Sequence, residues 1–270
     1  MDEEIRAYYE SGLELDRLAQ GYSRIEFART KELLSRFLPA PPADILDVGG
    51  GPGAYASWLA DAGYAVRLVD ATPLHVEQAV ELARGRFSAA AGDALALDEE
   101  DDSADVVLLL GPLYHLVARS DRLTALAEGH RVLRSGGLLV VAAISRFASL
   151  LDGLLRGLLD ADGWALVERD LADGTHLPKD AALFTTAYFH RPEELAGEIE
   201  EAGFALDGLF GVEGPGWLRA ESLDDEQARE NVIRVARSVE QEPAIIGASA
   251  HFLALAHPRL TQPHPQSYDR

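Results

Sequence analysis

Three acidic residues lie where apolar segments of the chain end, and their side chains are suited to binding a nucleoside. Asp47 lies within the apolar run 45–48, directly before a run of glycines, and Asp70 and Asp93 close the next two expected strands. One carboxylate can accept both hydroxyls of a ribose, or an exocyclic amine such as adenine N6. Asp70 follows Asp47 by 23 residues, close to the roughly 20-residue offset of ribose-binding acids in dinucleotide-binding folds.

The position of Asp47 inside an apolar strand requires a partner for its charge. An unpaired buried carboxylate is costly, so we expect Asp47 to accept backbone N–H groups of the glycine loop or to contact a positively charged part of the ligand. Each of the three acids taken singly also suits a turn or a strand-end cap. Their occurrence at successive strand ends favours a binding site.

The glycine-rich segment 49–54 predicts a tight turn that brings the backbone close to a ligand. Gly49, Gly51 and Ala54 satisfy the G-x-G-x-x-A pattern of dinucleotide-binding proteins, and Gly49, Gly51 and Gly53 satisfy G-x-G-x-G equally well. A helix expected at residues 55–62 would direct its free N–H groups toward the same ligand. The loop alone therefore indicates a nucleoside-bearing ligand and leaves its identity open.

Alternating strand and helix patterns position these residues. Continuous apolar strands such as residues 106–110 are typical of a sheet covered on both faces, and regular alternation predicts a parallel, doubly wound α/β fold. Its ligand belongs at the carboxyl ends of the strands. Strands are expected at residues 44–48, 65–70, 88–91, 105–110, 138–143, 204–210 and 251–256. Helices are expected at residues 55–62, 75–84, 121–133, 148–159, 192–202 and 224–241.

Two segments depart from this alternation. Residues 1–38 have apolar side chains at helical spacing and are expected to form an N-terminal helical arm, which packs at the surface or closes over a pocket. Residues 146–190 contain a helical run, a polar stretch at 168–180 and a β-like run at 183–189. We expect this segment to form a cap inserted over the strand ends after the fifth strand. Residues 1–270 then form a single domain.

The composition excludes several classes of site. The chain has no cysteine, which excludes disulfides, thiolate metal sites and a cysteine nucleophile. Its 45 acidic and 24 basic residues give a formal charge of −21, which repels DNA and RNA. No apolar run is long enough to span a membrane, and the acidic N-terminus is unlike a signal peptide. We expect a cytoplasmic protein, monomeric or homodimeric, that binds neither nucleic acid nor a membrane.

As a set, these motifs resemble the class I S-adenosylmethionine-dependent methyltransferases. The matching segments are residues 45–53 (ILDVGGGPG), 69–70, 92–94, 105–115 and 131–138. The resemblance implies a Rossmann-like, mostly parallel sheet of seven strands whose last strand is antiparallel, with S-adenosylmethionine as the cofactor. The residues that it implies for cofactor binding are Asp47, Gly49, Gly50, Gly51, Gly53, Asp70, Ala71, Gly92, Asp93, Ala94, Gly111, Pro112 and Leu113.

Four side chains are candidates for contact with the methyl acceptor. Tyr114 and His115 follow the fourth strand, and His115 is the first candidate for a general base because a histidine can titrate near neutrality. Glu213 lies in the glycine-rich turn 211–217, where it would act as a base or bind a cationic acceptor. His190 closes the β-like run of the cap. Packing, backbone hydrogen bonding or solvation would explain each of them equally well.

The sequence therefore predicts an enzyme that transfers a methyl group from S-adenosylmethionine to O, N or C of a small molecule. No group of histidines and acids at ligand spacing calls for a metal. Two alternatives stay open: an NAD-dependent oxidoreductase, and a non-catalytic protein that binds a nucleoside cofactor. A nicotinamide binder would leave Asp47 and Asp93 unexplained, because such enzymes commonly have an apolar residue at the first position and need no acid at the second.

Overall fold

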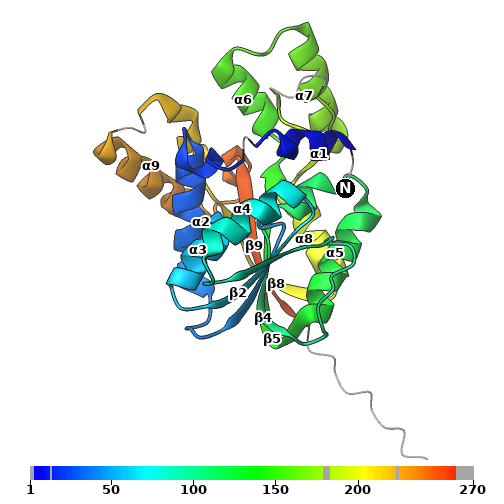
Figure 1. Ribbon diagram of the computed structural model, residues 1–270. Helices are drawn as coiled ribbons and strands as arrows, with labels where there is room; N and C mark the ends of the chain where they lie inside the picture. The colour runs from blue at the N-terminus through cyan, green and yellow to red at the C-terminus, as the bar shows by residue number, and fades with distance from the viewer. Residues whose placement is uncertain (1–2, 13, 179–182, 223–224, 260–270) are drawn as a thin grey trace, which may run out of the picture.

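The computed structural model describes residues 3–12, 14–178, 183–222 and 225–259, and shows a mixed sheet with helices on both faces (Figure 1). The α-helices are α1 (Glu3–Glu10), α2 (Ser23–Phe37), α3 (Ala54–Asp61), α4 (Pro73–Ala83), α5 (Arg119–Val132), α6 (Ala148–Arg156), α7 (Ala161–Asp173), α8 (Pro192–Glu201) and α9 (Glu226–Val239). The strands are β1 (Asp44–Val48), β2 (Ala65–Asp70), β3 (Ser88–Ala91), β4 (Ala104–Leu109), β5 (Leu133–Ser145), β6 (Thr175–His176), β7 (Ala187–His190), β8 (Phe204–Gly211) and β9 (His251–Pro258). Short 3₁₀ helices are η1 (Arg17–Ala19), η2 (Pro112–His115), η4 (Gly214–Ser222) and η5 (Ile246–Ala248).

The sheet confirms the doubly wound prediction. Strands β3, β2, β1, β4 and β5 are neighbours in that order and run parallel. Strand β9 pairs antiparallel with β5 and β8 pairs antiparallel with β9, so β9 is the reversed strand expected at the end of the chain. The strand order reverses between β1 and β4, and the carboxyl ends of these two strands therefore flank the expected ligand site.

Alternation along the strands divides the core between two helical layers. Val107 and Leu109 of β4 pack on the side of α5 and α8, whereas Val106 and Leu108 pack on the side of α2, α3 and α4. Figure 1 shows these helices on opposite faces of the sheet. Because strand side chains alternate, Asp47 lies on the same side as Ile45, under α3 and the glycine loop.

The cap segment, residues 146–190, enters and leaves beside the end of β5. Strand β7 pairs with β5 only through Ile144 with Phe189 and Ser145 with His190, and β6 pairs antiparallel with β7. Helices α6 and α7 stand above the sheet (Figure 1). The polar stretch at 168–180 is helical up to Asp173, in a helix that the sequence did not predict: Asp160 caps α7 and accepts the Gly163 N–H at 2.9 Å. Residues 179–182 and the first residue of the helix expected at 224–241 lie outside the described residues.

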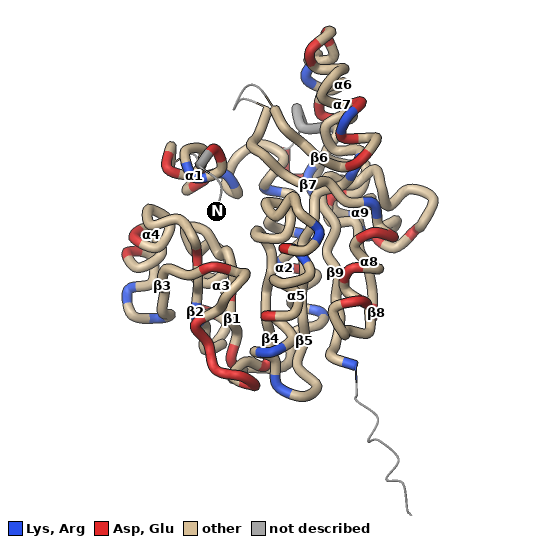
Figure 2. The backbone as a smooth tube through the Cα atoms, turned by 90° about the vertical axis from the view of Figure 1, so that its right-hand side faces the viewer, with Lys and Arg blue, Asp and Glu red and all other residues tan. Residues whose placement is uncertain are grey.

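The N-terminal arm is formed by α1, η1 and α2, as the apolar spacing predicts. Helix α2 packs beside the sheet through Leu33 and Leu34, while α1 lies above the strand ends (Figure 2). Ile5 of α1 is buried, and Thr186 of the cap segment donates its hydroxyl to Glu4 at 3.0 Å. The arm therefore meets the cap segment over the carboxyl ends of the strands.

Acidic residues are spread over the surface, and their densest run is remote from those strand ends. Figure 2 shows it as the continuous red run before β4, which corresponds to residues 98–102 (DEEDD). Because this run precedes β4, it lies at the opposite end of the sheet from the carboxyl edge. Within the described ranges, every helix is too short or too polar to cross a lipid bilayer.

Candidate functional site

Three neighbouring cavities lie at the carboxyl ends of the strands. The sheet-end cavity, about 350 Å³, is lined by residues that follow β1 to β4 together with α1. The inner cavity, about 80 Å³, lies between the glycine loop, η1 and His251. The arm–cap cavity, about 610 Å³, lies between the arm, the cap segment and Trp217. Tyr114 lines all three cavities, so they meet beside its side chain.

The glycine loop has the conformation that the sequence predicts. Gly49 and Gly53 have φ of 67° and 94°, in the left-handed region that other residues avoid. A Cβ on Gly49 would lie 2.6 Å from Cγ of Pro112, and one on Gly111 would lie 2.9 Å from the Gly49 carbonyl oxygen. The loop is therefore closed down against the turn after β4, and only glycine permits this approach.

Asp47 of β1 is a fully buried carboxylate beside the glycine loop. Neither of its oxygens has a hydrogen-bond partner within the described part of the chain, so the expectation that it accepts N–H groups of the loop was wrong. A Cβ on Gly50 would lie 2.6 Å from Oδ2 of Asp47, so the loop covers the carboxylate closely. Burial and the nearby charge of Asp70 raise the pKa of Asp47 to about 7. A cation in the inner cavity, which Asp47 lines, would supply the missing partner.

Asp70 is held in a fixed orientation at the end of β2. Its Oδ2 accepts the Gly51 N–H at 2.9 Å, and its Oδ1 accepts the Thr72 N–H at 2.8 Å and lies 3.3 Å from Nδ1 of His75. Although burial raises the pKa of Asp70, the hydrogen bonds and charge of His75 and the two backbone N–H bonds hold it below the usual value. A carboxylate has about four lone-pair sites, so Asp70 can still accept hydroxyl groups from the sheet-end cavity.

Most residues predicted to bind the cofactor line these cavities, and two do not. Asp93 lies at the rim of the sheet-end cavity, and its Oδ1 accepts the Leu95 N–H at 3.0 Å. Gly53 instead begins α3 beneath the ring of Phe87, and Leu113 is fully buried in the core. The predicted residues that line the inner or sheet-end cavity are Asp47, Gly49, Gly50, Gly51, Asp70, Ala71, Gly92, Asp93, Ala94, Gly111 and Pro112.

His115 is occupied by a contact with the arm. The Tyr9 hydroxyl lies 2.5 Å from Nε2 of His115, and Nδ1 lies 3.3 Å from the carbonyl oxygen of Thr186. Since that carbonyl only accepts, Nδ1 carries the proton and Nε2 accepts the hydroxyl of Tyr9. Burial lowers the pKa of His115 to about 4, so its ring is neutral. His115 lines the sheet-end cavity but not the arm–cap cavity, which places it on the cofactor side of the site.

Replacing Tyr9 with phenylalanine is expected to loosen α1 over the sheet-end cavity. The lost hydrogen bond to His115 contributes about 1 kcal/mol, so backbone amides of residues 3–10 should exchange with deuterium several times faster. Tyr8→Phe is the matched control, because no hydrogen bond of the Tyr8 hydroxyl is seen among the described residues, while its ring contacts Tyr9 and Phe184. Equal exchange in the two variants would mean that Tyr9 and His115 do not hold the arm.

His190 is packed against an ion pair in the interior and does not line the three cavities. It is fully buried, and its Nε2 lies 3.2 Å from Oε2 of Glu198. Arg122 of α5 donates to both oxygens of Glu198 of α8, so this ion pair joins the two helices. His190 lines none of the three cavities, so the structure does not bring it to the other candidates.

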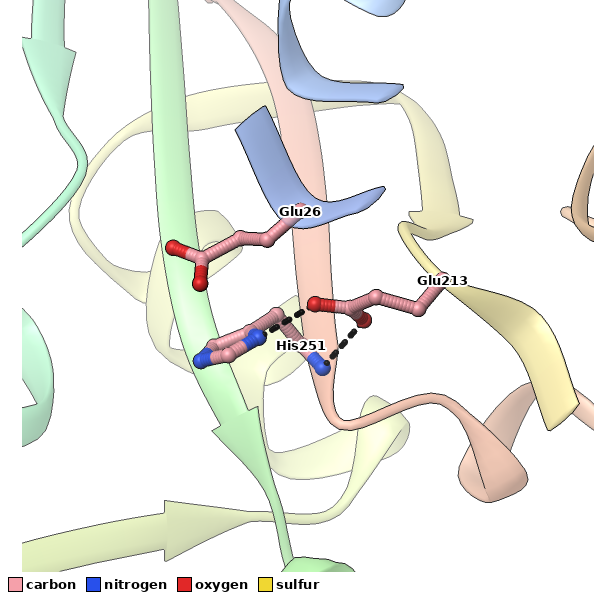
Figure 3. A group of neighbouring side chains, drawn as sticks. All are labelled: Glu26, Glu213 and His251. Carbon is pink, nitrogen blue, oxygen red and sulfur yellow. Dashed lines mark hydrogen bonds and ion pairs between the residues drawn. The ribbon is translucent and has the colours of Figure 1, made fainter. Parts of the chain in front are cut away.

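A network of five charged side chains lies where the inner and arm–cap cavities meet; its members are Glu14, Arg17, Glu26, Glu213 and His251. Glu213 is fully buried and accepts hydrogen bonds from the Ser249 hydroxyl at 2.9 Å, the His251 N–H at 3.0 Å and the His251 ring at 2.6 Å (Figure 3). Arg17 binds both oxygens of Glu26 at 2.6 and 3.0 Å. His251 and Arg17 line both cavities, whereas Glu213 lies behind His251.

The network contains two positive side chains, Arg17 and His251, and three negative ones, Glu14, Glu26 and Glu213. Burial acts to lower the pKa of His251, but the charges of Glu213 and Glu26 and the hydrogen bond to Glu213 raise it to about 9. One ligand atom each of Glu26, Glu213 and His251 lies within 4.8 Å of the others, a spacing that suits a metal ion. The guanidinium of Arg17, which pairs with Glu14 and Glu26, and the imidazolium of His251 already place two positive charges beside these ligand atoms.

The arm–cap cavity has an apolar body and a polar end. Its walls include the aromatic rings of Tyr8, Tyr22, Phe184, Phe189 and Trp217. Its polar end is formed by His251, Arg17 and Glu14, next to Tyr114, and Ser149, Asp152 and Arg156 of α6 also line the cavity. The volume and the mixture of aromatic and polar side chains are those of a small-molecule site.

Several lining residues have no motif in the sequence. Arg17 and Tyr9 lie in the arm, which the sequence identified only as a segment able to close over a pocket. His251 begins the last strand and lies 38 positions after Glu213, so no local spacing links the two. Thr72 and His75 follow Asp70 closely, and the Pro73 that begins α4 is the local signal for a helix N-terminus beside the acid.

Known proteins resemble the chain in the region that forms the site. A family model described as a methyltransferase domain matches residues 45–137. The methyltransferase GfsG of Streptomyces halstedii is 31% identical over 60% of the chain, and the match spans 54% of that protein's own length. The ubiquinone biosynthesis O-methyltransferase of Xylella fastidiosa is 29% identical over 72% of the chain and 74% of its own length.

Solved structures share the fold. An S-adenosylmethionine-dependent methyltransferase from Methanosarcina mazei superposes with a TM-score of 0.60 at 20% identity, covering 85% of this chain and 98% of the other. This similarity extends beyond residues 45–137 and includes most of the sheet.

Proposed function

We propose that the protein transfers the methyl group of S-adenosylmethionine to a small molecule held in the arm–cap cavity. The chain belongs to the class I S-adenosylmethionine-dependent methyltransferases, and the proposal starts from that membership. The observation that carries this proposal is the unpartnered carboxylate of Asp47, buried under Gly50 at the inner cavity. The ammonium group of the methionine part would supply the cation that Asp47 lacks. The acidic ends of β2 and β3 would hold the nucleoside part.

The donor set suits the cofactor along the whole carboxyl edge. Asp47 and the glycine loop would hold the methionine end. Asp70, kept ionised by its hydrogen bonds, would accept the ribose hydroxyls. Asp93, Ala94 and Leu95 would flank the adenine at the rim of the sheet-end cavity. When bound, the cofactor supplies an electrophilic methyl group with a good leaving group.

The protein's own contribution is mainly to orient the acceptor and exclude water. Tyr114 lines all three cavities and lies where cofactor and acceptor would meet. Burial raises the pKa of Tyr114, so its hydroxyl stays protonated and is available as a hydrogen-bond donor. Tyr9 and Phe184 close the site from the arm and the cap segment. The small-molecule acceptor is favoured by the 610 Å³ cavity, and the charge of −21 opposes a nucleic acid.

Calorimetric titration tests the cofactor. We expect S-adenosylmethionine and its demethylated product S-adenosylhomocysteine to bind with micromolar dissociation constants, the lower part of the usual range for enzyme ligands, and NAD not to bind. Tight binding of NAD without a response to either sulfur compound would instead indicate the oxidoreductase. Turnover of a broad acceptor panel, followed by release of S-adenosylhomocysteine, would separate an enzyme from a non-catalytic cofactor-binding protein.

A further inference from the structure

The polar end of the arm–cap cavity contains an oriented histidine that the cofactor does not require. Glu213 only accepts, and it accepts from Ser249 and from the backbone and ring of His251. The ring nitrogen Nδ1 must therefore carry a proton, which fixes Nε2 as the nitrogen that gains or loses one. Figure 3 shows Nε2 turned away from Glu213, and Nε2 has no hydrogen-bond partner within the described ranges.

The position of His251 connects it to both reactants. Its side chain is 20% exposed, and it lines the inner cavity together with Asp47 and the glycine loop, as well as the arm–cap cavity. A methyl group carried by a cofactor bound at the loop would have to pass between these two cavities. His251 lies at that junction, whereas His115 lies in the sheet-end cavity with its Nε2 taken by Tyr9.

We propose that His251 is the general base of the reaction, that Glu213 is its positioning residue, and that the acceptor is a hydroxyl group on a bulky aromatic molecule. This inference rests on the proposed function. As the acceptor oxygen forms its bond to the methyl carbon, the carbon–sulfur bond of the sulfonium breaks and its electron pair stays on sulfur. The hydroxyl proton passes to Nε2 of His251, which leaves an ether, S-adenosylhomocysteine and an imidazolium.

A hydroxyl acceptor follows from the presence of an oriented base. A neutral amine attacks through its lone pair and can release its proton afterwards, whereas a hydroxyl is a weak nucleophile until its proton is removed. The cavity walls provide the aromatic and aliphatic surface for the rest of the molecule, including Tyr22, Trp217 and Phe184. The relative from Xylella fastidiosa is named as an O-methyltransferase, which agrees with oxygen as the acceptor atom.

The charged groups around His251 set the pH dependence of such a base. Glu213 approaches from the turn after β8, Glu26 from α2 and Arg17 from η1. Glu14, which pairs with Arg17, lines both cavities beside His251, Asp47 lines the inner one, and the phenols of Tyr22 and Tyr114 line the arm–cap cavity. With a pKa of about 9 for His251, the fraction of free base increases roughly fiftyfold between pH 7 and pH 9. Methyl transfer should increase in parallel and level off above that pH.

A chromogenic phenol tests the proposal without turnover. We expect 4-nitro-1-naphthol, added to the complex with S-adenosylhomocysteine, to bind as the yellow phenolate at a pH where the free compound is mostly protonated. At that pH His251 is an imidazolium, and its Nε2–H stabilises the anion in the same ion pair that proton transfer from a hydroxyl to Nε2 produces. His251→Gln should bind it as the neutral phenol. His257→Gln is the matched control, a histidine at the far end of β9 that pairs with Asp207; it should behave as the wild type.

Turnover supplies the second measurement. In a panel of naphthols and hydroxyquinolines, His251→Gln should lose about 100-fold or more of the methylation rate and its rise with pH. Ser249→Ala, which keeps His251 but removes one hydrogen bond to Glu213, should shift the midpoint of the pH profile. Failure of the phenol to bind, the same bound spectrum in wild type and His251→Gln, or an unchanged pH profile in His251→Gln would each overturn the proposal. Because the spectra are also recorded without S-adenosylhomocysteine, failure of cofactor binding would remain distinguishable from failure of the base.

Discussion

Asp47→Asn is expected to weaken S-adenosylhomocysteine binding by at least two orders of magnitude. The substitution keeps the size and shape of the side chain but removes the charge that would pair with the cofactor's ammonium group under Gly50. Removing one partner of a buried ion pair costs about 3–5 kcal/mol, and each 1.4 kcal/mol corresponds to a tenfold change in the dissociation constant. Calorimetric titration of both proteins at pH 8 measures the difference.

The same variant should become more stable relative to the wild type as pH increases. The pKa of Asp47 is about 7 in the folded protein, against 3.8 for an unperturbed aspartate. At a pH between these two values, the folded protein keeps a proton on Asp47 that the unfolded protein has already lost. Stability from this group is therefore fully present below about pH 4 and is lost as pH approaches 7. The lost part amounts to roughly 4 kcal/mol, and the neutral asparagine of the variant has no such dependence.

Urea unfolding without ligand at pH 4.5 and pH 8 would measure this relative gain. Asp44→Asn is the matched control, since Asp44 lies at the other end of β1 and pairs with Arg134 at the surface. It should change neither cofactor affinity nor the pH dependence by much. Unchanged affinity in Asp47→Asn would contradict the assignment of Asp47 to the cofactor's ammonium group.

Gly49→Ala is expected to abolish measurable cofactor binding and to lower the free energy of unfolding by about 2–5 kcal/mol. The left-handed backbone accounts for about 1–2 kcal/mol of this loss. The remainder comes from the new Cβ, 2.6 Å from Cγ of Pro112, because overpacking costs typically 1–3 kcal/mol. To relieve the contact, the glycine loop must move away from the turn after β4, and the two walls of the inner cavity then separate.

Gly136→Ala isolates the backbone contribution. Gly136 has φ of 77°, and a Cβ there would have no atom within 4 Å. This variant should lose only about 1–2 kcal/mol and keep the affinity for S-adenosylhomocysteine, as measured by urea unfolding and calorimetry. Similar losses of stability and affinity in the two variants would show that the contact between Gly49 and Pro112 has no special role.

The sheet was predictable because its strands are marked by local patterns. The bounds of β1, β2 and β3 agree with the expected ones, since each strand is a short apolar run between turn residues. Strand β5 begins at Leu133, earlier than expected. Residues 134–137 (RSGG) have no apolar pattern, but they belong to the strand because its pairing with β4 continues past a shift in register between Ala104 and Val106. Helix α7 was missed because its polar face resembles a loop and its cap, Asp160, lies in a stretch without a clear apolar period.

The two sides of the site differed in how far the sequence could predict them. The cofactor side is built from strand ends that are consecutive in the chain, so Asp47, Asp70 and Asp93 could be located from their positions alone. The acceptor side depends on contacts between distant segments. His251 and Glu213 lie on different elements, and Arg17 and Tyr9 reach the cavity only because α1 and η1 fold over the sheet. No local pattern specifies such contacts.

The entry and exit of the cap segment have a consequence for how this enzyme class varies. The Arg146 N–H donates to the His190 carbonyl at 2.8 Å. The chain therefore leaves and rejoins the body of the protein at two residues that are direct hydrogen-bond partners. The segment between these residues can therefore differ in length while β5 and α8 keep their places, provided that a replacement keeps the contacts of Thr186 with His115 and Glu4. Under the proposed function, such a change would act first on the acceptor, because Phe184 and Phe189 of this segment line the arm–cap cavity.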